Sequence, residues 1–446
     1  MRTRNIIEII RKIIPWLLLG IIVLLPWQAQ FIFQEGEIGG ESWQYGTFSV
    51  FAIDILIVAV VLLLLFAQRN SGIKLQKYVW ILLGAFFATA FFSIWFSTDR
   101  EVSWFRLALL LEGYGVLWLF SSVKFSLRQL GYAFGLSGVI QSVFAISQFI
   151  TQKVFASTLL GTAEHLPEVI GNSVIEAGGR FLRAYGTFQH PNLLAGFLVL
   201  CFIFVIGWYF ISKKRIDSIF SLSAISIISV GLFFTFSRSA WGVMGASIFF
   251  LVFLALMTRG LVNRRKIISA LIVIILISTI FSAMNFSIIS TRLASNARLE
   301  VQSATERITG YEDSWTLLKD SWLHGVGIGA YTSSVREDVD TSREVWQLQP
   351  VHNIYLLIAT ELSIFGFIFF ALFLIELIRK GVQKLSMLQS ISFEWVVYLT
   401  AGLAVLLLGL FDHYFWSLHP GSLLMWLIFG LAIAAFFRNS HGVDNL

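Results

Sequence analysis

The chain has 446 residues, of which 57% are hydrophobic and 13% are charged, and its mean hydropathy is +0.80. Too few polar side chains are present to cover a water-soluble surface, so the composition excludes a soluble globular protein and indicates a membrane protein. The net charge of +6 lies mainly in clusters beside apolar runs, so we attribute it to membrane topology and expect no nucleic-acid partner.

Apolar runs long enough to cross the hydrocarbon of a bilayer as a helix, about 18 to 22 residues each, recur along the whole chain. They predict an all-α polytopic membrane protein with twelve transmembrane helices in a single bundle over residues 1–446. The predicted helices are centred near residues 20, 58, 88, 113, 140, 200, 227, 248, 275, 362, 402 and 427.

Basic residues set the predicted orientation, because Lys and Arg near span ends are retained on the cytoplasmic side. Four basic side chains precede the first span, so we expect the N-terminus inside, and twelve spans return the C-terminus to the same side. A cleaved signal peptide is the alternative, but no small-x-small cleavage site follows "IIPWLLLGIIVLLPW". Basic clusters recur after even-numbered spans, at Arg69/Lys74/Lys77, Lys213/Lys214/Arg215, Arg264/Arg265/Lys266 and Arg379/Lys380/Lys384.

The predicted outer side has a distinctive set of charged side chains. It holds ten arginines but only two lysines, and the arginine fork suits phosphate oxygens better than an ammonium group does. Pairing with acidic loop residues is a sufficient explanation for most of these arginines. Six of the seven histidines also fall outside, so we expect chemistry on the outer face. The one cysteine, Cys201, lies inside a span and excludes a disulfide framework.

Three predicted outer connections are longer than the rest, over residues 28–48, 151–188 and 285–350, and long loops commonly carry function. In the last one, apolar residues at helical spacing predict an amphipathic helix that lies on the outer membrane surface or caps the bundle. The glycines of "HGVGIGAY" follow it without a preceding strand, so we interpret them as a helix stop. The apolar residues of the helix are Ile308, Tyr311, Trp315, Leu318 and Trp322.

Four polar patches stand at the outer ends of predicted spans. A single arginine or histidine in such a place is more often an interface residue, but four patches on one side of one bundle favour a shared site. An arginine-rich rim at a bilayer surface suits a lipid-linked phosphate or pyrophosphate, and an imidazole titrates near neutral pH and suits a general base. The patches are Arg180/Arg183/His190/Asn192, Arg238 in "SRSAW", Arg307 in "ER" and His352 in "VHN".

The same stretches carry a resemblance to a known family. In order along the chain, "RAYGTFQHPNLLAGFL", "SRSAW", "ERITGYEDSWTLLKDSWLHGVGIGAY" and "VHNIYLLIATELSIFGF" resemble the O-antigen ligase and O-antigen polymerase superfamily. "SIWFSTDREVSW" and "FDHYFWSLHPGSLLMWLIFG" are similar to patterns of the same family, so the resemblance covers most of the chain.

The resemblance implies a glycosyltransferase of the C-type architecture in the bacterial cytoplasmic membrane, with its active site on the outer face. Its donor would be a glycan on undecaprenyl pyrophosphate, and transfer to an acceptor hydroxyl would invert the anomeric carbon. The acceptor stays open among lipid A core, a growing glycan, a protein hydroxyl and a wall polymer, as does the choice between ligase and polymerase.

The resemblance also implies roles for individual residues. Arg183 and Arg238 would bind the donor pyrophosphate, and His352 would activate the acceptor hydroxyl. Secondary candidates for the pyrophosphate are Arg180 and Arg307, and the candidates that shape the pocket are His190, Asn192 and Asn353.

Two of these positions carry a second interpretation. A structural cap on the following span explains His190 as well as a pocket role does. The family commonly has a glycine nine residues after its "HN" pair, whereas this chain has Ser363 there and retains Gly366. The serine in place of glycine puts the close packing of this helix in question more than the chemistry of the site.

We expect no metal ion and no other cofactor, because arginine side chains can replace a cation at a departing pyrophosphate. The alternative is the D-x-D spacing of Asp338 and Asp340, which holds a divalent cation in many glycosyltransferases. Arg336 and Arg343 alternate with these acids, which favours a solvated run of charges.

Two other classes of protein remain as alternatives. A lipid-linked glycan flippase or another transporter needs ionisable residues inside its spans, and Asp54, Glu112 and Glu361 are such residues. The peptidoglycan-polymerising shape and division proteins share the donor chemistry. Their long loop comes earlier in the chain, so the loop position disfavours them.

Overall fold

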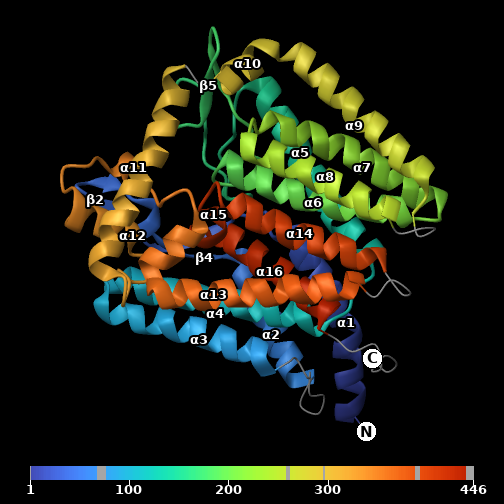
Figure 1. Cartoon of the computed structure of the whole chain (residues 1–446), viewed down its shortest axis with the longest axis horizontal. Helices are drawn as coiled ribbons and strands as arrows, with labels where there is room; N and C mark the ends of the chain where they lie inside the picture. Colours follow the sequence, from blue (N-terminus) through green and yellow to red (C-terminus); the bar gives the residue numbers. More distant parts are fainter. Residues whose placement is uncertain (1, 68–76, 258–261, 295–296, 387–391, 438–446) are drawn as a thin grey trace.

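The structure is a computed structural model that describes residues 2–67, 77–257, 262–294, 297–386 and 392–437. It is mostly helical, and long helices lie side by side with their axes close to horizontal in Figure 1. Within the described ranges, nine helices are long and apolar enough to cross a membrane. The chain is therefore a multi-pass membrane protein, as its composition predicted.

The nine candidate spans correspond to nine of the twelve predicted centres. The remaining centres fall on α1 (Arg2–Leu24), which begins with charged residues, and on α2 (Ala52–Ala67) and α14 (Phe393–Gly409), which are apolar but have 16 and 17 residues. The total of twelve therefore stays a prediction. The nine are α3 (Lys77–Ser93, extended to Phe96 by a 3₁₀ turn), α4 (Arg100–Ser122), α5 (Leu127–Thr151), α6 (Pro191–Ile211), α7 (Arg215–Phe234), α8 (Arg238–Met257), α9 (Arg264–Met284), α13 (Ile354–Ser386) and α16 (His419–Phe436).

Helices α6 and α16 form the centre of the bundle. The most apolar stretch of each is 94% buried inside the protein, against 22% for α9 at the periphery. A helix that is apolar on every side is buried on every side, which is the pattern of α6. Small residues allow close approach around α16, since a Cβ on Gly113 of α4 would lie 2.3 Å from the Trp426 ring.

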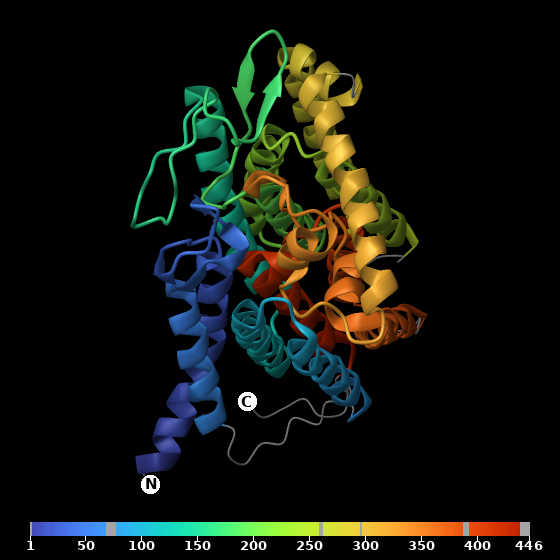
Figure 2. The ribbon, with the colours of Figure 1, turned by 90° about the vertical axis from the view of Figure 1, so that its left-hand side faces the viewer.

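The three long connections gather at one end of the bundle, which we call the loop end. It lies on the left of Figure 1 and faces the viewer in Figure 2. The expectation of an all-helical chain omitted its short strands, which pair as three two-stranded antiparallel sheets. The pairs are β1 (Gln30–Gln34) with β4 (Phe48–Phe51), β2 (Glu37–Ile38) with β3 (Glu41–Ser42), and β5 (Val174–Glu176) with β6 (Arg180–Leu182).

The predicted outer loop 285–350 contains several helices. The longest, α11 (Arg298–Ser321), includes most of the predicted amphipathic segment and runs across the loop end, crosswise to the candidate spans (Figures 1 and 2). The others are α10 (Phe286–Ala294), α12 (Tyr331–Ser334), a π-helical turn at Val335–Val339 and a 3₁₀ turn at Val345–Gln347.

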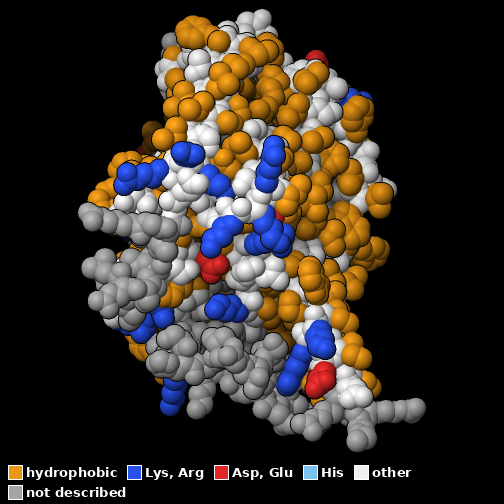
Figure 3. All heavy atoms as spheres, turned by 90° about the vertical axis from the view of Figure 1, so that its right-hand side faces the viewer, with side chains coloured by type: hydrophobic (Ala, Val, Ile, Leu, Met, Phe, Trp, Pro, Cys, Tyr) orange, Lys and Arg blue, Asp and Glu red, His pale blue; other side chains and the backbone are white. Residues whose placement is uncertain are grey.

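The opposite end of the bundle is predicted to be cytoplasmic. Figure 3 shows lysine and arginine side chains gathered near the middle of that end, with hydrophobic side chains around them. Arg69, Lys74 and the C-terminal residues 438–446, on which part of the topology prediction depends, lie outside the described residues. The orientation therefore stays a prediction.

Helix α13 is broken at Ser363, where the family commonly has glycine. Ser363 has φ 78° and ψ 171°, a backbone conformation that is nearly exclusive to glycine. The break leaves the Glu361 carbonyl free to accept a hydrogen bond from outside the helix. The amide of Gly327, in the "HGVGIGAY" stretch, donates to it at 3.1 Å. A Cβ on Gly325 would lie 2.2 Å from that same carbonyl oxygen, so this contact requires glycine.

Candidate functional site

His352 and Asp412 form the centre of the site at the loop end. His352 lies just before α13, and Asp412 lies between α14 and α15 (Tyr414–Ser417). Nδ1 of His352 is 3.5 Å from Oδ1 of Asp412, which is ion-pair distance but longer than a hydrogen bond, and the His352 side chain is 19% exposed. A carboxylate on this side favours the proton on Nδ1 and leaves Nε2 as the basic nitrogen.

Asn192 holds the other oxygen of the Asp412 carboxylate, and Arg183 holds Asn192. Asn192 is the second residue of α6, and its Nδ2 donates to Oδ2 of Asp412 at 2.7 Å. A guanidinium nitrogen of Arg183 donates to Oδ1 of Asn192 at 2.6 Å. The order Arg183, Asn192, Asp412, His352 is therefore a chain of polar contacts that joins three segments far apart in the sequence.

Arg183 is buried and largely engaged by the protein. Besides Asn192, its Nε donates to the Thr235 carbonyl at 2.7 Å and another nitrogen to Oγ of Ser173 at 2.9 Å. Burial and the neighbouring Arg292 lower the pKa of Arg183 to about 9, so the guanidinium keeps its charge at neutral pH. Three of its five N–H groups are used, which fixes the plane of the guanidinium.

Two further histidines surround Asp412. His413 has its ring centroid 5.0 Å from that of His352 and its Nδ1 2.5 Å from Oγ of Ser417. His190 caps α6, where its Nδ1 accepts from the Asn192 amide at 3.1 Å. Burial lowers the pKa of His413 to about 3 and that of His190 to about 4, so both rings are neutral at neutral pH.

These surroundings keep Asp412 ionised. Burial by itself would raise the pKa of this carboxyl group. The contact with His352, together with the nearby imidazoles of His413 and His190, outweighs burial and holds the pKa of Asp412 well below its usual range. Asp412 is therefore a fixed anion behind His352 at neutral pH, which suits stabilisation of an imidazolium ring.

A group of arginines lies beside this centre. Arg238, at the start of α8, donates to the Arg292 carbonyl at 2.8 Å and lies 3.3 Å from Oε2 of Glu300. Arg292 forms an ion pair with the other oxygen of Glu300. Arg307 on α11 lies close enough for its charge to lower the pKa of His190 and His413. Arg183, Arg238 and Arg292 therefore lie around one buried carboxylate, Glu300, and Arg307 lies close to Arg292.

The remaining predicted site residues lie at the edge of this arrangement. Arg180 is exposed on β6 and donates to the Glu168 carbonyl at 3.4 Å. Asn353 caps α13, where its Oδ1 accepts from the amides of Tyr355 and Leu356. The structure therefore brings Arg183, His190, Asn192, Arg238, Arg307, His352 and Asn353 to the loop end, with Arg180 on the surface nearby.

A cavity of about 420 Å³ opens next to His413. Tyr45 and Ser417 line it, and both contact His413. The ring centroids of Tyr45 and His413 are 6.2 Å apart, and Oγ of Ser417 forms the hydrogen bond to His413 given above. Many of its other lining side chains are uncharged amides, hydroxyls and aromatic rings, including Gln30, Gln44, Thr47, Ser49, Phe51, Phe105, Thr162, Thr187, Phe188 and Gln189.

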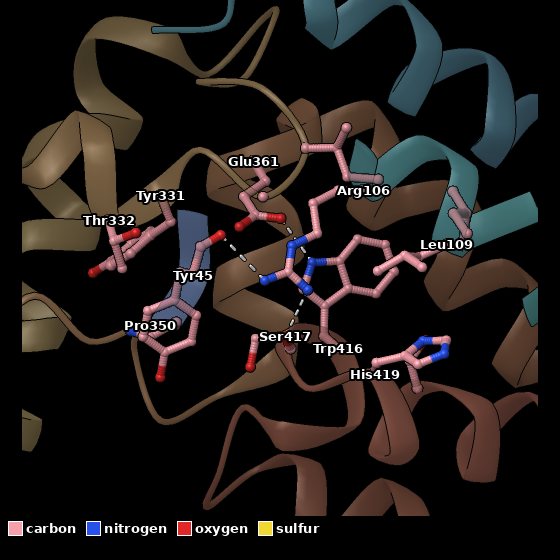
Figure 4. Close-up of a pocket in the computed structure, with 14 residues that line it drawn as sticks. Tyr45, Arg106, Leu109, Tyr331, Thr332, Pro350, Glu361, Trp416, Ser417 and His419 are labelled. Atoms are coloured by element: carbon pink, nitrogen blue, oxygen red, sulfur yellow. Dashed lines mark hydrogen bonds between the residues drawn. The ribbon is translucent and has the colours of Figure 1, made fainter. Parts of the chain in front are cut away.

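Arg106 lies between this cavity and a second, smaller pocket (Figure 4). It donates to the Ser417 carbonyl at 2.8 Å, while its Nε is buried with no hydrogen-bond partner. Glu361 faces the same pocket and accepts from Nε1 of Trp416 at 2.7 Å. Glu361, a residue on which the transporter alternative depended, therefore lies at the loop end.

The other two intramembrane acids meet at a second histidine. Nε2 of His419 lies 2.7 Å from Oδ1 of Asp54 and 3.6 Å from Oε2 of Glu112. The cluster joins α2, α4 and α16. All three acids of the transporter alternative thus have partners at one end of the bundle.

Two groups of side chains among the described residues converge closely enough to hold a metal ion. They are His352 with Asp412 and His413, and His419 with Asp54 and Glu112. In the D-x-D stretch, Asp340 instead accepts from Ser342 at 2.6 Å and lies 3.5 Å from Arg343. Arg343 also pairs with Asp313, so this stretch is bound into a local charge network.

Four functional candidates were not predicted from the sequence: Asp412, His413, Arg292 and Arg106. The adjacent acid and histidine in "FDHYF" at a predicted outer span end were a usable signal for the first two. Arg292 and Arg106 had no comparable signal, because an arginine near a span end is common and its partners come from distant segments.

The fold and the site define a multi-pass membrane protein with a histidine–carboxylate centre beside a group of arginines. The O-antigen ligase family model matches residues 223–371, about a third of the chain. This segment is similar to the O-antigen ligase domain, which supports the resemblance to the O-antigen ligase and polymerase superfamily, a glycosyltransferase-like enzyme family. No curated protein matches the chain.

The matched segment carries only part of the site. Arg238, Arg307 and His352 lie inside it, together with Glu300. Arg183, Asn192, Asp412 and His413 lie outside it and join it only in three dimensions.

Proposed function

We propose that this protein transfers a glycan from undecaprenyl pyrophosphate to an acceptor hydroxyl at the outer face of the bacterial cytoplasmic membrane, as an O-antigen ligase or a polysaccharide polymerase. The observation that carries the proposal is the polar chain from Arg183 to His352 beside the arginine group. The family match supports the same reaction class.

His352 is the general base of the proposed reaction. Its Nε2 removes the proton of the acceptor hydroxyl as the oxygen attacks the anomeric carbon of the donor sugar. The bond from that carbon to the pyrophosphate oxygen breaks on the opposite face, so the configuration inverts and undecaprenyl pyrophosphate leaves. Asp412 stabilises the imidazolium ring that forms, because it stays ionised and lies on the Nδ1 side.

The arginine group binds the departing pyrophosphate. Arg238 and Arg307 come from α8 and α11, and Arg292 lies between them in charge contact with both. One carboxylate, Glu300, pairs with Arg238 and Arg292, so the group keeps a net positive charge for the phosphates. Arg183 adds its charge and orients Asn192. Fixed cations at a developing anion stabilise the transition state without a metal ion.

The cavity beside His413 is the proposed site for sugar residues of a substrate. Its amides and hydroxyls match the hydroxyl groups of a saccharide, and its aromatic rings offer flat apolar faces. It reaches His352 through His413 and lies where an acceptor hydroxyl can approach the base.

Reconstitution tests the proposal directly. The protein is placed in liposomes with a defined undecaprenyl-pyrophosphate oligosaccharide and a set of acceptors that includes lipid A core and the lipid-linked glycan itself. Mass spectrometry is expected to detect a joined product with an inverted linkage and free undecaprenyl pyrophosphate. Movement of intact lipid-linked glycan across the liposome membrane, with no joined product, would support a flippase instead.

A further inference from the structure

Helix α11 has three faces, one of which is apolar and exposed. The face against the protein carries buried polar residues, among them Asp313, Ser314 and Ser321. A second face is exposed and polar, with Thr305 and Thr316 on it. The third face is an exposed apolar stripe, here called the aromatic stripe, made of Val301, Ile308, Tyr311, Trp315 and Trp322, which are 43 to 61% exposed.

We infer that the aromatic stripe of α11 lies in the bilayer leaflet at the loop end, so that α11 is an interfacial helix whose partner is membrane lipid. Its crosswise course over the end of the candidate spans is the course of a helix in the membrane surface (Figures 1 and 2). α11 is not itself among the candidate spans.

The composition of the stripe identifies lipid as the partner. Tryptophan and tyrosine concentrate where hydrocarbon meets head groups, and the stripe contains two tryptophans and a tyrosine. Nζ of Lys319 lies 5.8 Å from the centre of the Trp315 ring, so a cation stands beside an aromatic anchor, as is common at that boundary.

The exposed apolar surface also continues into the neighbouring elements. Met284 at the end of α9, and Phe286 and Leu293 of α10, are 64 to 79% exposed. α9 is the least buried of the candidate spans, so lipid surrounds much of it, and α10 leads directly from it to α11. Exposed apolar side chains are therefore present on a span, on α10 and on the stripe of α11.

The proposed position of α11 in the leaflet has a consequence for the site. Glu300 and Arg307 lie toward the protein side of α11, Glu300 in contact with Arg238 and Arg292, and Arg307 near His190 and His413. The bilayer therefore helps to hold one wall of the arginine group in position.

Spin labelling tests the inference without any substrate. Single cysteines replace Ile308 and Trp315 on the stripe, and Thr305 and Thr316 on the polar face, in a Cys201→Ser background, in phosphatidylcholine–phosphatidylglycerol nanodiscs. Power saturation measures the collision of each nitroxide with oxygen and with a water-soluble nickel chelate. The ratio of oxygen to nickel accessibility is expected to be severalfold higher at 308 and 315 than at 305 and 316.

Two results would overturn the inference. High nickel accessibility at all four positions would place α11 in water, and low accessibility to both reagents at 308 and 315 would mean that protein covers the stripe. A second measurement uses unlabelled protein in case a cysteine disturbs the helix. The tryptophan emission lost in brominated lipid is expected to be smaller in Trp315→Phe than in the parent protein. The same loss of emission in both proteins would contradict contact between Trp315 and lipid.

Discussion

Two histidine–carboxylate clusters lie at the loop end, and their surroundings differ. His352 is partly exposed, its carboxylate partner is held by Asn192, and four arginines lie nearby. His419 is 5% exposed and two carboxylates, from α2 and α4, share its ring. The same residue types thus form an accessible imidazole in one cluster and a buried connection between helices in the other.

The comparison shows which features distinguish the proposed active cluster from the other one. In both clusters a carboxylate oxygen lies within 3.5 Å of an imidazole nitrogen. Only the first also has an accessible imidazole and cations placed to bind an anionic leaving group. We therefore expect substitutions in the first cluster to change rate and substitutions in the second to change stability.

Replacement of His352 gives the largest expected effect. His352→Ala removes the proposed base and should lower the transfer rate about 10²- to 10⁴-fold, while the affinity for lipid pyrophosphate stays close to that of the parent protein. His419→Gln is the corresponding change in the second cluster and should mainly lower the unfolding temperature, with a much smaller loss of rate, since His419 contacts the two acids and only lines the cavity. Transfer at the parental rate by folded His352→Ala would remove His352 from the mechanism.

Replacement of the arginines comes next. Arg183→Ala and Arg238→Ala should each lower the transfer rate about 10²- to 10³-fold, the usual loss for one electrostatic donor to a developing anion. Lysine at either position should restore only part of the rate, because a point charge does not reproduce two-pronged binding. Arg298→Ala is the control, since Arg298 pairs with Glu176 on the surface. An equal loss in Arg298→Ala would point to a general charge effect.

Asp412→Asn should have a smaller effect, about 10- to 100-fold on the transfer rate, because it removes a partner that orients the histidine rather than the histidine itself. The pH–rate profile distinguishes this role from a structural one. Without the anion behind His352, protonation of the ring is less favourable, so the acidic limb of the profile, along which the base loses its proton and the rate rises, should move to lower pH. An unchanged profile with a reduced rate would indicate loss of structure alone.

Ser363→Gly should stabilise the protein by about 1 kcal/mol, because glycine adopts the backbone conformation of the α13 break without steric cost. Thermal unfolding in detergent measures the difference. Ser363→Ala keeps a Cβ at the same position and serves as the control, with an unfolding temperature close to the parental one. A lower unfolding temperature for the glycine variant would show that the serine hydroxyl matters more than the backbone strain.

Removal of metal ions should have no effect on transfer, since the arginine group supplies the positive charge at the leaving group. The measurement is the transfer rate in EDTA. A loss that magnesium or manganese restores would contradict the expectation. His413→Ala, His419→Gln and Asp338→Ala would then show which of the three candidate groups holds the ion.

Much of the fold could be predicted from the sequence because the signals are local. The long apolar runs correspond to the candidate spans. The amphipathic spacing before "HGVGIGAY" corresponds to α11, and the glycines of that stretch follow the end of the helix at Ser321. The glycines of that stretch have positive φ at Gly325, Gly327 and Gly329, which other residues rarely adopt. The short hairpins of the loop end were missed, because two- to five-residue strands have no periodicity to read.

The site was predictable only as a set of residue types at span ends. His352, Arg183 and Arg238 were singled out because charge and imidazole are rare beside a membrane and because the motifs resembled a family. Their roles depend on distances between α6, α8, α13 and the segment before α15, and Asp412 is 220 residues from the Asn192 that holds it.

The sequence by itself determined that this protein lies in a membrane, that it is helical, and which polar residues stand at the ends of its helices, because each of these follows from the hydrophobicity of neighbouring residues. Only the tertiary structure decided which histidine received an exposed ring and an arginine-flanked carboxylate, and which was enclosed between two acids. Helix packing sets those distances, and electrostatic effects at a site depend on distance and burial rather than on position along the chain.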